Sequence, residues 1–79
     1  MKVFCEMRLT NFQFWAGAKD NAAMLEYDEL EQLEYMLEDI YPEGIEETTI
    51  NDLMWFDFEI VCEWLGLELD VDKWEIKRD

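Results

Sequence analysis

The chain has 79 residues, of which 21 are Asp or Glu and six are Lys or Arg, for a formal net charge of -15. This length allows one domain, and we predict a single compact acidic domain over residues 1–79. Twelve aromatic residues (four Trp, three Tyr and five Phe) exclude a disordered acidic tail, and the shortage of cations excludes direct binding to nucleic acid. The apolar runs are too short to cross a membrane and the first residues show no secretory signal, so we expect a cytoplasmic location.

The first residues alternate between apolar and polar side chains. Over residues 2–9 the apolar members are Val3, Cys5, Met7 and Leu9. A period of two predicts a strand with one buried face. Three aromatic residues follow it: Phe12, Phe14 and Trp15. They favour a second short extended piece, which leaves open whether the first strand is single or part of a β-hairpin.

Helical patterns begin after Gly17. Residues 18–26 are rich in alanine, and the clearest helix covers residues 28–40. Asp28 and Glu31 resemble a capping box at its start. Its apolar positions recur at helical spacing and are Leu30, Leu33, Leu37 and Ile40, with Met36 alongside. The turn sequence Tyr-Pro-Glu-Gly at residues 41–44 ends this helix.

Two more helices are predicted in the second half. One begins at Thr49, and the other covers residues 58–65, with Asp57 as its N-cap and Gly66 as its end. The second helix is apolar on two sides: one holds Phe58, Val61, Cys62 and Leu65, and the other holds Ile60 and Trp64. We therefore expect it to be the central helix. Residues 70–77 fit a short helix or a strand, and we favour the helix.

The predicted fold is α+β and rich in helix. An N-terminal strand or β-hairpin packs against three to four short helices, since a two-stranded ribbon is only marginally stable alone. Five aromatic residues at helical spacing are expected in the core: Trp15, Trp55, Phe56, Phe58 and Trp64. Four Trp are more than a domain of this size can bury. We therefore expect one or two aromatic side chains at the surface, drawn from Trp15, Trp55, Trp74, Tyr27 and Tyr35.

The residue types exclude most catalytic chemistry. The chain has no His and no Ser, so it lacks Ser-His-Asp and Cys-His machinery and His-containing zinc sites. Cys5 and Cys62 are expected to be reduced core residues, with a disulfide between them as the alternative. Asp70, Asp72 and Glu75 lack the glycine and the terminal glutamate of a calcium-binding loop. We predict no enzyme activity, no metal site and no cofactor.

The placement of charge is more informative than its total. All six cations lie within residues 2–19 or 73–78, and the 53 residues from Asp20 to Asp72 hold 18 acids and no cation. Like charges in a small fold reduce its stability, so a property other than folding has selected this pattern. On the helix 28–40 the acids share the arc opposite the leucines, with Tyr35 in its middle, and the following loop adds more. We name these residues the acidic ridge: Asp28, Glu31, Glu34, Tyr35, Glu38, Asp39, Glu43, Glu46 and Glu47.

Two segments resemble a known group of proteins. They are TINDLMWFDFEIVCEWLG at residues 49–66, preceded by YPEG at 41–44, and the opening KVFCEMRLTNFQFWAGAKDNA. Both are similar to segments of small, very acidic proteins of bacteriophages and mobile elements. By size and charge, such proteins resemble anti-CRISPR proteins and other DNA mimics that inhibit bacterial defence. The resemblance implies this class of function by analogy, implies that the cytoplasm is that of a bacterial host cell, and assigns no site residues.

We predict a non-enzymatic inhibitor whose acidic ridge mimics nucleic-acid charge and blocks the cationic groove of a basic nucleic-acid-binding protein, such as a defence nuclease. The alternative is an acidic accessory or structural protein that assembles with itself or a partner through exposed aromatics. An antitoxin-like neutraliser of a basic enzyme would share the acidic interface. The identity of the partner, and whether the chain forms a homodimer, stay open.

Overall fold

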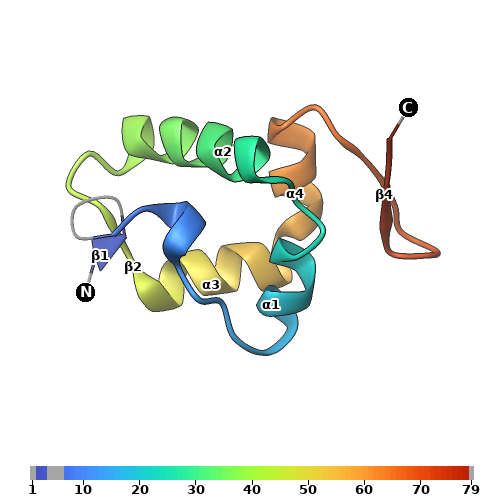
Figure 1. The fold of residues 1–79 in the computed structure, drawn as a ribbon, viewed down its shortest axis with the longest axis horizontal. Coiled ribbons are helices and arrows are strands. Elements are labelled where there is room, and N and C mark those ends of the chain that lie inside the picture. Colours follow the sequence, from blue (N-terminus) through green and yellow to red (C-terminus); the bar gives the residue numbers. More distant parts are fainter. Residues whose placement is uncertain (1, 4–6, 79) are drawn as a thin grey trace.

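The computed structural model describes residues 2–3 and 7–78, and every structural statement below concerns these residues. In them the chain forms four α-helices, one 3-10 helix and four short strands. The long helix α2 (Tyr27–Ile40) runs along the top of Figure 1, α3 (Glu47–Phe56) runs below it, and α4 (Phe58–Trp64) lies at one end. The 3-10 helix η1 (Leu9–Asn11) lies between α2 and α3. The predicted helix-rich α+β class is confirmed.

Helix α2 begins one residue before its predicted start. Glu26 is the N-cap, and the Glu29 side chain accepts a hydrogen bond of 2.8 Å from the Glu26 backbone N–H. The Glu26 side chain in turn accepts from the Glu29 backbone, which completes a capping box. The predicted pair Asp28 and Glu31 therefore does not cap the helix, because both residues lie inside it. The helix ends at the predicted turn, where the Gly44 N–H bonds back to the carbonyl of residue 41.

Helices α3 and α4 also lie close to their predicted positions. Helix α3 begins at Glu47, two residues before the predicted Thr49. Helix α4 ends where predicted, because Gly66 adopts a positive φ of 71°. There the Leu67 N–H reaches back to the Cys62 carbonyl at 2.8 Å. This hydrogen bond closes the helix end in the manner typical of a glycine-terminated helix.

The core is built from the predicted apolar stripes of α2, α3 and α4. Its buried members are Leu9, Phe12, Ala18, Leu25, Leu33, Leu37, Ile45, Ile50, Met54, Phe58, Val61, Cys62 and Leu65. The burial of each large apolar side chain stabilises the fold by about 1.5–3 kcal/mol. Helix α4 buries only one of its two apolar sides, because Ile60 and Trp64 stay exposed. The prediction that α4 is the central helix is therefore wrong.

The N-terminal strand pairs with a distant partner. Strand β1 (Lys2–Val3) runs antiparallel to β2 (Ile45–Glu46), with Val3 opposite Ile45. The alternating segment ends in η1, which covers residues 9–11. In the described residues the strand partner of β1 is β2, so the alternative of a hairpin with the segment from Phe12 to Trp15 is not observed. The expectation for Cys5 lies outside the described residues. Cys62 is buried and its thiol is free.

The C-terminal segment is a β-hairpin, so the prediction of a helix over residues 70–77 is wrong. Strand β3 (Glu68–Asp70) pairs antiparallel with β4 (Glu75–Lys77). The Asp70 carboxylate accepts backbone hydrogen bonds from Asp72 at 3.0 Å and Lys73 at 3.2 Å. The same hydrogen bonds could cap a helix, but Trp74 adopts a positive φ of 54°, so the chain reverses into β4 after the turn. The alternation of side chains over residues 74–78 is typical of a strand, and β4 forms there.

Two side chains fix this hairpin to the helical body. The Trp74 indole N–H donates to the Asn21 amide oxygen at 2.7 Å, and the Asn21 amide nitrogen donates to the Met54 carbonyl at 3.0 Å. Asn21 belongs to α1 (Ala16–Ala22), so one amide joins α1, α3 and the hairpin. Arg78 forms a fork on the Glu29 carboxylate, with contacts of 2.5 and 2.7 Å. The contacts Trp74–Asn21 and Arg78–Glu29 each link residues about fifty positions apart in the sequence.

Most aromatic residues lie at the surface. Of the five expected in the core, only Phe58 is buried, and Phe56 is 69 % exposed. The expectation of one or two exposed aromatics is also too low, because Trp15, Tyr27, Tyr35, Trp55 and Trp74 are all exposed. Trp55 and Phe56 stack on each other, with ring centroids 4.7 Å apart. Helical spacing alone therefore overestimated the burial of aromatic side chains.

Candidate functional site

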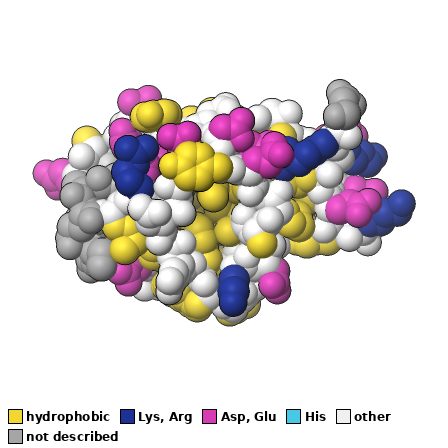
Figure 2. Space-filling view, viewed as in Figure 1, with side chains coloured by type: hydrophobic (Ala, Val, Ile, Leu, Met, Phe, Trp, Pro, Cys, Tyr) yellow, Lys and Arg dark blue, Asp and Glu magenta, His cyan; other side chains and the backbone are white. Residues whose placement is uncertain are grey.

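The solvent side of α2 carries the central part of the predicted acidic ridge. Asp28 and Asp39 are exposed near its two ends, and Tyr35 is 59 % exposed between them. Glu31 and Glu38 are half-buried along one flank of this side. In the view of Figure 2, acidic side chains follow the upper edge of the molecule, where α2 runs. We call Asp28, Glu31, Tyr35, Glu38 and Asp39 the α2 acidic surface.

Glu34 does not belong to this surface, and the prediction that it lies on the exposed ridge is wrong. Its side chain is only 1 % exposed. One carboxylate oxygen accepts a hydrogen bond of 2.6 Å from the Leu9 backbone N–H, and the other lies 2.7 Å from an Arg8 guanidinium nitrogen. Glu34 thus attaches η1 to α2. Its role in the structure is to satisfy a buried N–H and to pair with a cation.

Arg8 lies beside the α2 acidic surface, where it forms a hydrogen bond with Tyr35. Its side chain is 51 % exposed. The pKa of Arg8 is raised above its ordinary value, first by the Glu34 carboxylate and then by a hydrogen bond with Tyr35. Tyr35 is the aromatic member of the predicted acidic ridge. In the free protein its arginine neighbour is Arg8 of its own chain.

The rest of the predicted ridge lies beyond the end of α2. Glu43 and Glu46 are exposed in the turn and in β2, while Glu47 is half-buried at the start of α3. Glu47 lines a shallow pocket together with Trp15 and with Asn11 of η1. It therefore diverges from the solvent side of α2. The structure brings Asp28, Glu31, Glu38 and Asp39 onto one helix, and the loop acids continue around its end.

Carboxylates also occupy other surfaces. Exposed acids outside the predicted ridge are Asp20, Glu26, Asp52, Asp57, Glu59, Glu63, Glu68, Asp72 and Glu75. The cations whose side chains are described are fewer: Arg8 precedes η1, Lys19 is on α1, and Lys73, Lys77 and Arg78 belong to the C-terminal hairpin and its end. In Figure 2, dark blue side chains gather at the end of the molecule where the hairpin lies. The α2–α3–α4 surface away from that end is thus acidic over a wider area than the ridge alone.

An apolar groove lies where the end of α2 meets α3 and α4. Its volume is about 320 Å³, and its lining includes Ile40, Tyr41 and Trp64. Ile40 was predicted to be a core residue, but it is 59 % exposed. Two carboxylates, those of Asp52 and Asp57, are also part of the lining. No Lys or Arg lines this groove in the described part of the chain.

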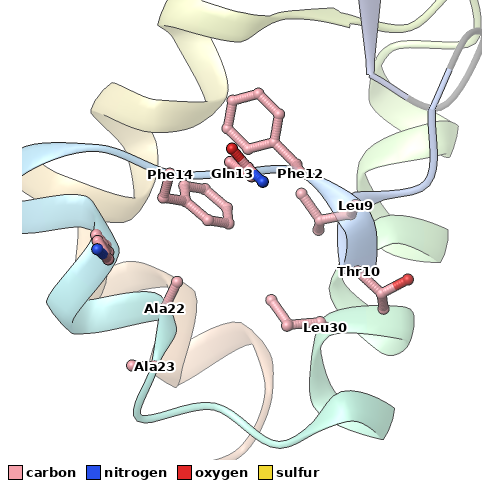
Figure 3. Close-up of a pocket in the computed structure, with 9 residues that line it drawn as sticks. Leu9, Thr10, Phe12, Gln13, Phe14, Ala22, Ala23 and Leu30 are labelled. Atoms are coloured by element: carbon pink, nitrogen blue, oxygen red, sulfur yellow. The ribbon is translucent and has the colours of Figure 1, made fainter.

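A second hollow lies between α1, η1 and α2. Its volume is about 490 Å³, and Figure 3 shows Leu9, Phe12, Phe14, Ala22 and Leu30 around it. The polar residues of its lining are Thr10, Gln13 and Lys19. Its described lining contains no carboxylate, in contrast to the groove beside Trp64. The two depressions therefore differ in charge as well as in position.

The described residues show no cluster of side chains that could hold a metal ion. No three Cys, Asp or Glu residues of residues 2–3 and 7–78 are placed to hold a metal ion together. Asp70 uses its carboxylate to close the hairpin loop. Burial raises the pKa of the Cys62 thiol, and Glu29 adds to this effect. A buried thiol with a raised pKa is a poor nucleophile.

Sequence reasoning missed the groove, although it noted some of its residues. Ile60 and Trp64 were recognised as a second apolar side of α4, and this side was assigned to the interior. A second signal was Asp57, which lies one turn from Ile60 and two turns from Trp64 on that side. Its carboxylate next to the apolar stripe is typical of a surface position. The stripe and the acid together would have predicted an exposed apolar patch with an acidic edge.

Comparisons with protein-family models, with curated proteins and with solved structures found no match to this chain. The resemblance to small acidic phage proteins therefore stays a prediction. Of the helices in the described segments, none combines the length and the apolar character needed to cross a bilayer.

Proposed function

We propose that this chain is a non-enzymatic inhibitor that binds the cationic groove of a basic nucleic-acid-binding protein and excludes nucleic acid from it. A bacterial defence nuclease is the partner class that fits this role. The α2 acidic surface supplies the main contact, and Glu43 and Glu46 extend it. Glu34 is not part of the interface, because its carboxylate is used inside the protein.

The observation that carries this proposal is the absence of cations from Asp20 to Asp72, although the helices there would be more stable with them. Helices α2, α3 and α4 all lack a basic residue in the last turn. A cation there contributes about 0.3–1 kcal/mol through the helix dipole, and an anion opposes it. Asp39 is an exposed anion at such a position. The charge pattern reduces stability, which favours selection for binding.

The geometry of α2 supports a linear contact with a cationic groove. Asp28 and Asp39 are separated by eleven residues, which correspond to roughly 16 Å along a helix at about 1.5 Å per residue. Glu31, Tyr35 and Glu38 lie between them. Phosphates on duplex DNA supply about one charge per 1.7 Å of axis, so the helix covers only a short stretch of such a groove. Complementary charge would speed the encounter, and salt would weaken the complex.

The exposed aromatics favour a second candidate function. An accessory or structural protein could assemble with itself or a partner through side chains such as Phe56, which is 69 % exposed and stacked on Trp55. Aromatic side chains are frequent anchors of protein interfaces. In this case the acidity would serve solubility alone, and charge reversal on α2 would leave the association intact.

A triple reversal separates the two candidates. The test variant carries Glu31→Lys, Glu38→Lys and Asp39→Lys, and the control carries Glu59→Lys, Glu63→Lys and Glu75→Lys, which change the net charge equally on other elements. Both are immobilised with the wild type, exposed to nuclease-treated bacterial lysate at low salt, and eluted with increasing salt. Each captured basic protein is then tested for displacement of its DNA or RNA by the free chain.

We expect the test variant to bind at least about tenfold more weakly, since exposed charge pairs contribute about 0.2–1 kcal/mol each and reversal adds repulsion. The control should stay within about threefold of the wild type. Equal losses in both variants would show that only the net charge matters. Capture of no basic nucleic-acid-binding protein, or no displacement of nucleic acid, would refute the proposal.

A further inference from the structure

The groove beside Trp64 has walls from three helices and a strand. Ile40 and Tyr41 come from the end of α2, Leu53 from α3, and Trp64 from the end of α4, with Ile45 of β2 between them. At about 320 Å³ it lies near the lower limit of the roughly 300–1,000 Å³ typical of binding pockets. It can therefore admit a few side chains of a partner.

The exposure of these apolar residues has no explanation within the fold. Ile40 is 59 % exposed and Trp64 is 41 % exposed, while Ile60 is exposed one turn before Trp64. Leu37 and Ile45, which line the same groove as Ile40 and Trp64, are buried. Apolar side chains that gather around a depression, in contrast to scattered ones, indicate an interaction site.

The charge of the groove restricts what can occupy it. Asp52 and Asp57 are exposed at its edge, and the described lining contains no cation. Glu43 lines the adjacent depression, which shares Ile40 and Tyr41 with the groove. An occupant therefore has to present apolar side chains to the centre and positive charge to the edge. A second copy of this chain does not fit, because each copy has a net charge of -15.

We propose that this groove binds the apolar side of a basic amphipathic helix of the partner protein. The partner's Lys or Arg side chains pair with Asp52 and Asp57, and its apolar side chains contact Ile40 and Trp64. This inference rests on the proposed function, because it names a structural feature of the same basic partner. It adds a second contact with the same partner, apolar in character and on another side of α2 than the α2 acidic surface.

The test uses three synthetic helical peptides as probes at low salt. The first has a leucine face and a lysine face, the second replaces leucine by alanine, and the third replaces lysine by glutamine. The groove variants are Ile40→Ser with Trp64→Ser, and separately Asp52→Asn with Asp57→Asn. The matched controls are Tyr27→Ser, at the other end of α2, and Asp20→Asn with Asp72→Asn. Circular dichroism and thermal unfolding show that each variant is folded, and calorimetry measures binding.

We expect the leucine–lysine peptide to bind at least tenfold more tightly than the other two. Each groove variant should remove most of this advantage, while the controls keep it. The proposal is overturned if the leucine and alanine peptides bind equally, if the groove variants bind like the wild type, or if no peptide binds. If both lysine peptides bind equally and only the Glu31, Glu38 and Asp39 reversal abolishes binding, the proposed function stands and the groove is not part of it.

Discussion

Replacement of Glu34 by alanine tests the unexpected role of this residue most directly. Its carboxylate is buried and accepts a 2.6 Å hydrogen bond from the Leu9 N–H, while Arg8 lies 2.7 Å from its other oxygen. Leu9 is itself fully buried, so its N–H has no route to water once the carboxylate is removed. If Glu34 were a surface residue of an acidic ridge, its removal would relieve repulsion and cost nothing.

The expected loss of stability follows from these contacts. A hydrogen bond to a charged group contributes about 1.5–3 kcal/mol, and a buried N–H left without a partner costs about 1–3 kcal/mol. The Arg8 pair adds at most about 1 kcal/mol, because half of the Arg8 side chain is in solvent. We expect a loss of about 3 kcal/mol, which lowers the melting temperature of a domain of this size by roughly 12–24 °C. Glu34→Gln keeps an acceptor for Leu9 and should lose only about 1 kcal/mol.

Thermal and urea unfolding followed by circular dichroism measure these differences. Glu38→Ala is the matched control, since Glu38 is one turn further along α2 and half-buried. This variant should unfold within about 0.5 kcal/mol of the wild type. If Glu34→Ala unfolds at the same temperature as Glu38→Ala, the assignment of Glu34 to the interior is wrong.

Three further predictions concern the hairpin and the core. The hydrogen bond from Arg78 lowers the pKa of Glu29. The stability that this hydrogen bond gives is therefore complete at neutral pH and is lost as the pH falls through the lowered pKa. Glu29→Gln should be less stable than the wild type in urea unfolding at neutral pH, and this difference should vanish in acid. In a Cys5→Ala variant, Cys62 should react with a thiol reagent only under unfolding conditions, and fast reaction of the native protein would contradict its burial. Asn21→Ala removes the side-chain amide that joins α1, α3 and the Trp74 indole. It should lower the free energy of unfolding by about 1–3 kcal/mol and speed backbone hydrogen exchange in the hairpin. Unchanged exchange would show that the hairpin does not depend on Asn21.

Local patterns in the sequence predicted most of the helices. The leucine spacing of α2, the turn at residues 41–44 and the glycine at residue 66 all act through neighbours within one or two turns. Such signals depend on backbone geometry and capping, which hardly vary between folds. The Asp70 side chain also acts locally, but its hydrogen bonds to the backbone of Asp72 and Lys73 fit a turn and a helix N-cap equally well. The pairing of β3 with β4 decides for the hairpin.

The candidate site was predicted less well, because helical spacing does not fix how a helix is rotated against its neighbours. Glu34 lies only about 40° around the helix from Leu30 and about 60° from Leu37, at 100° per residue. It therefore belongs to the buried side of α2 as much as to the acidic side. Ile40 lies toward the other flank, where no element covers it. A small difference in the rotation of α2 therefore buries Glu34, which was predicted at the surface, and exposes Ile40, which was predicted in the core.

The sequence by itself determined most of the helical segments, the C-terminal ends of α2 and α4 and the cation-free acidic stretch, because these properties depend on neighbouring residues and on composition. Only the tertiary structure decided that Glu34 binds the Leu9 N–H, that β1 pairs with β2, and that Ile40 and Trp64 meet beside two aspartates. These contacts join residues from 24 to 44 positions apart. They depend on which buried donors lack partners and on which apolar sides remain uncovered once the helices have packed.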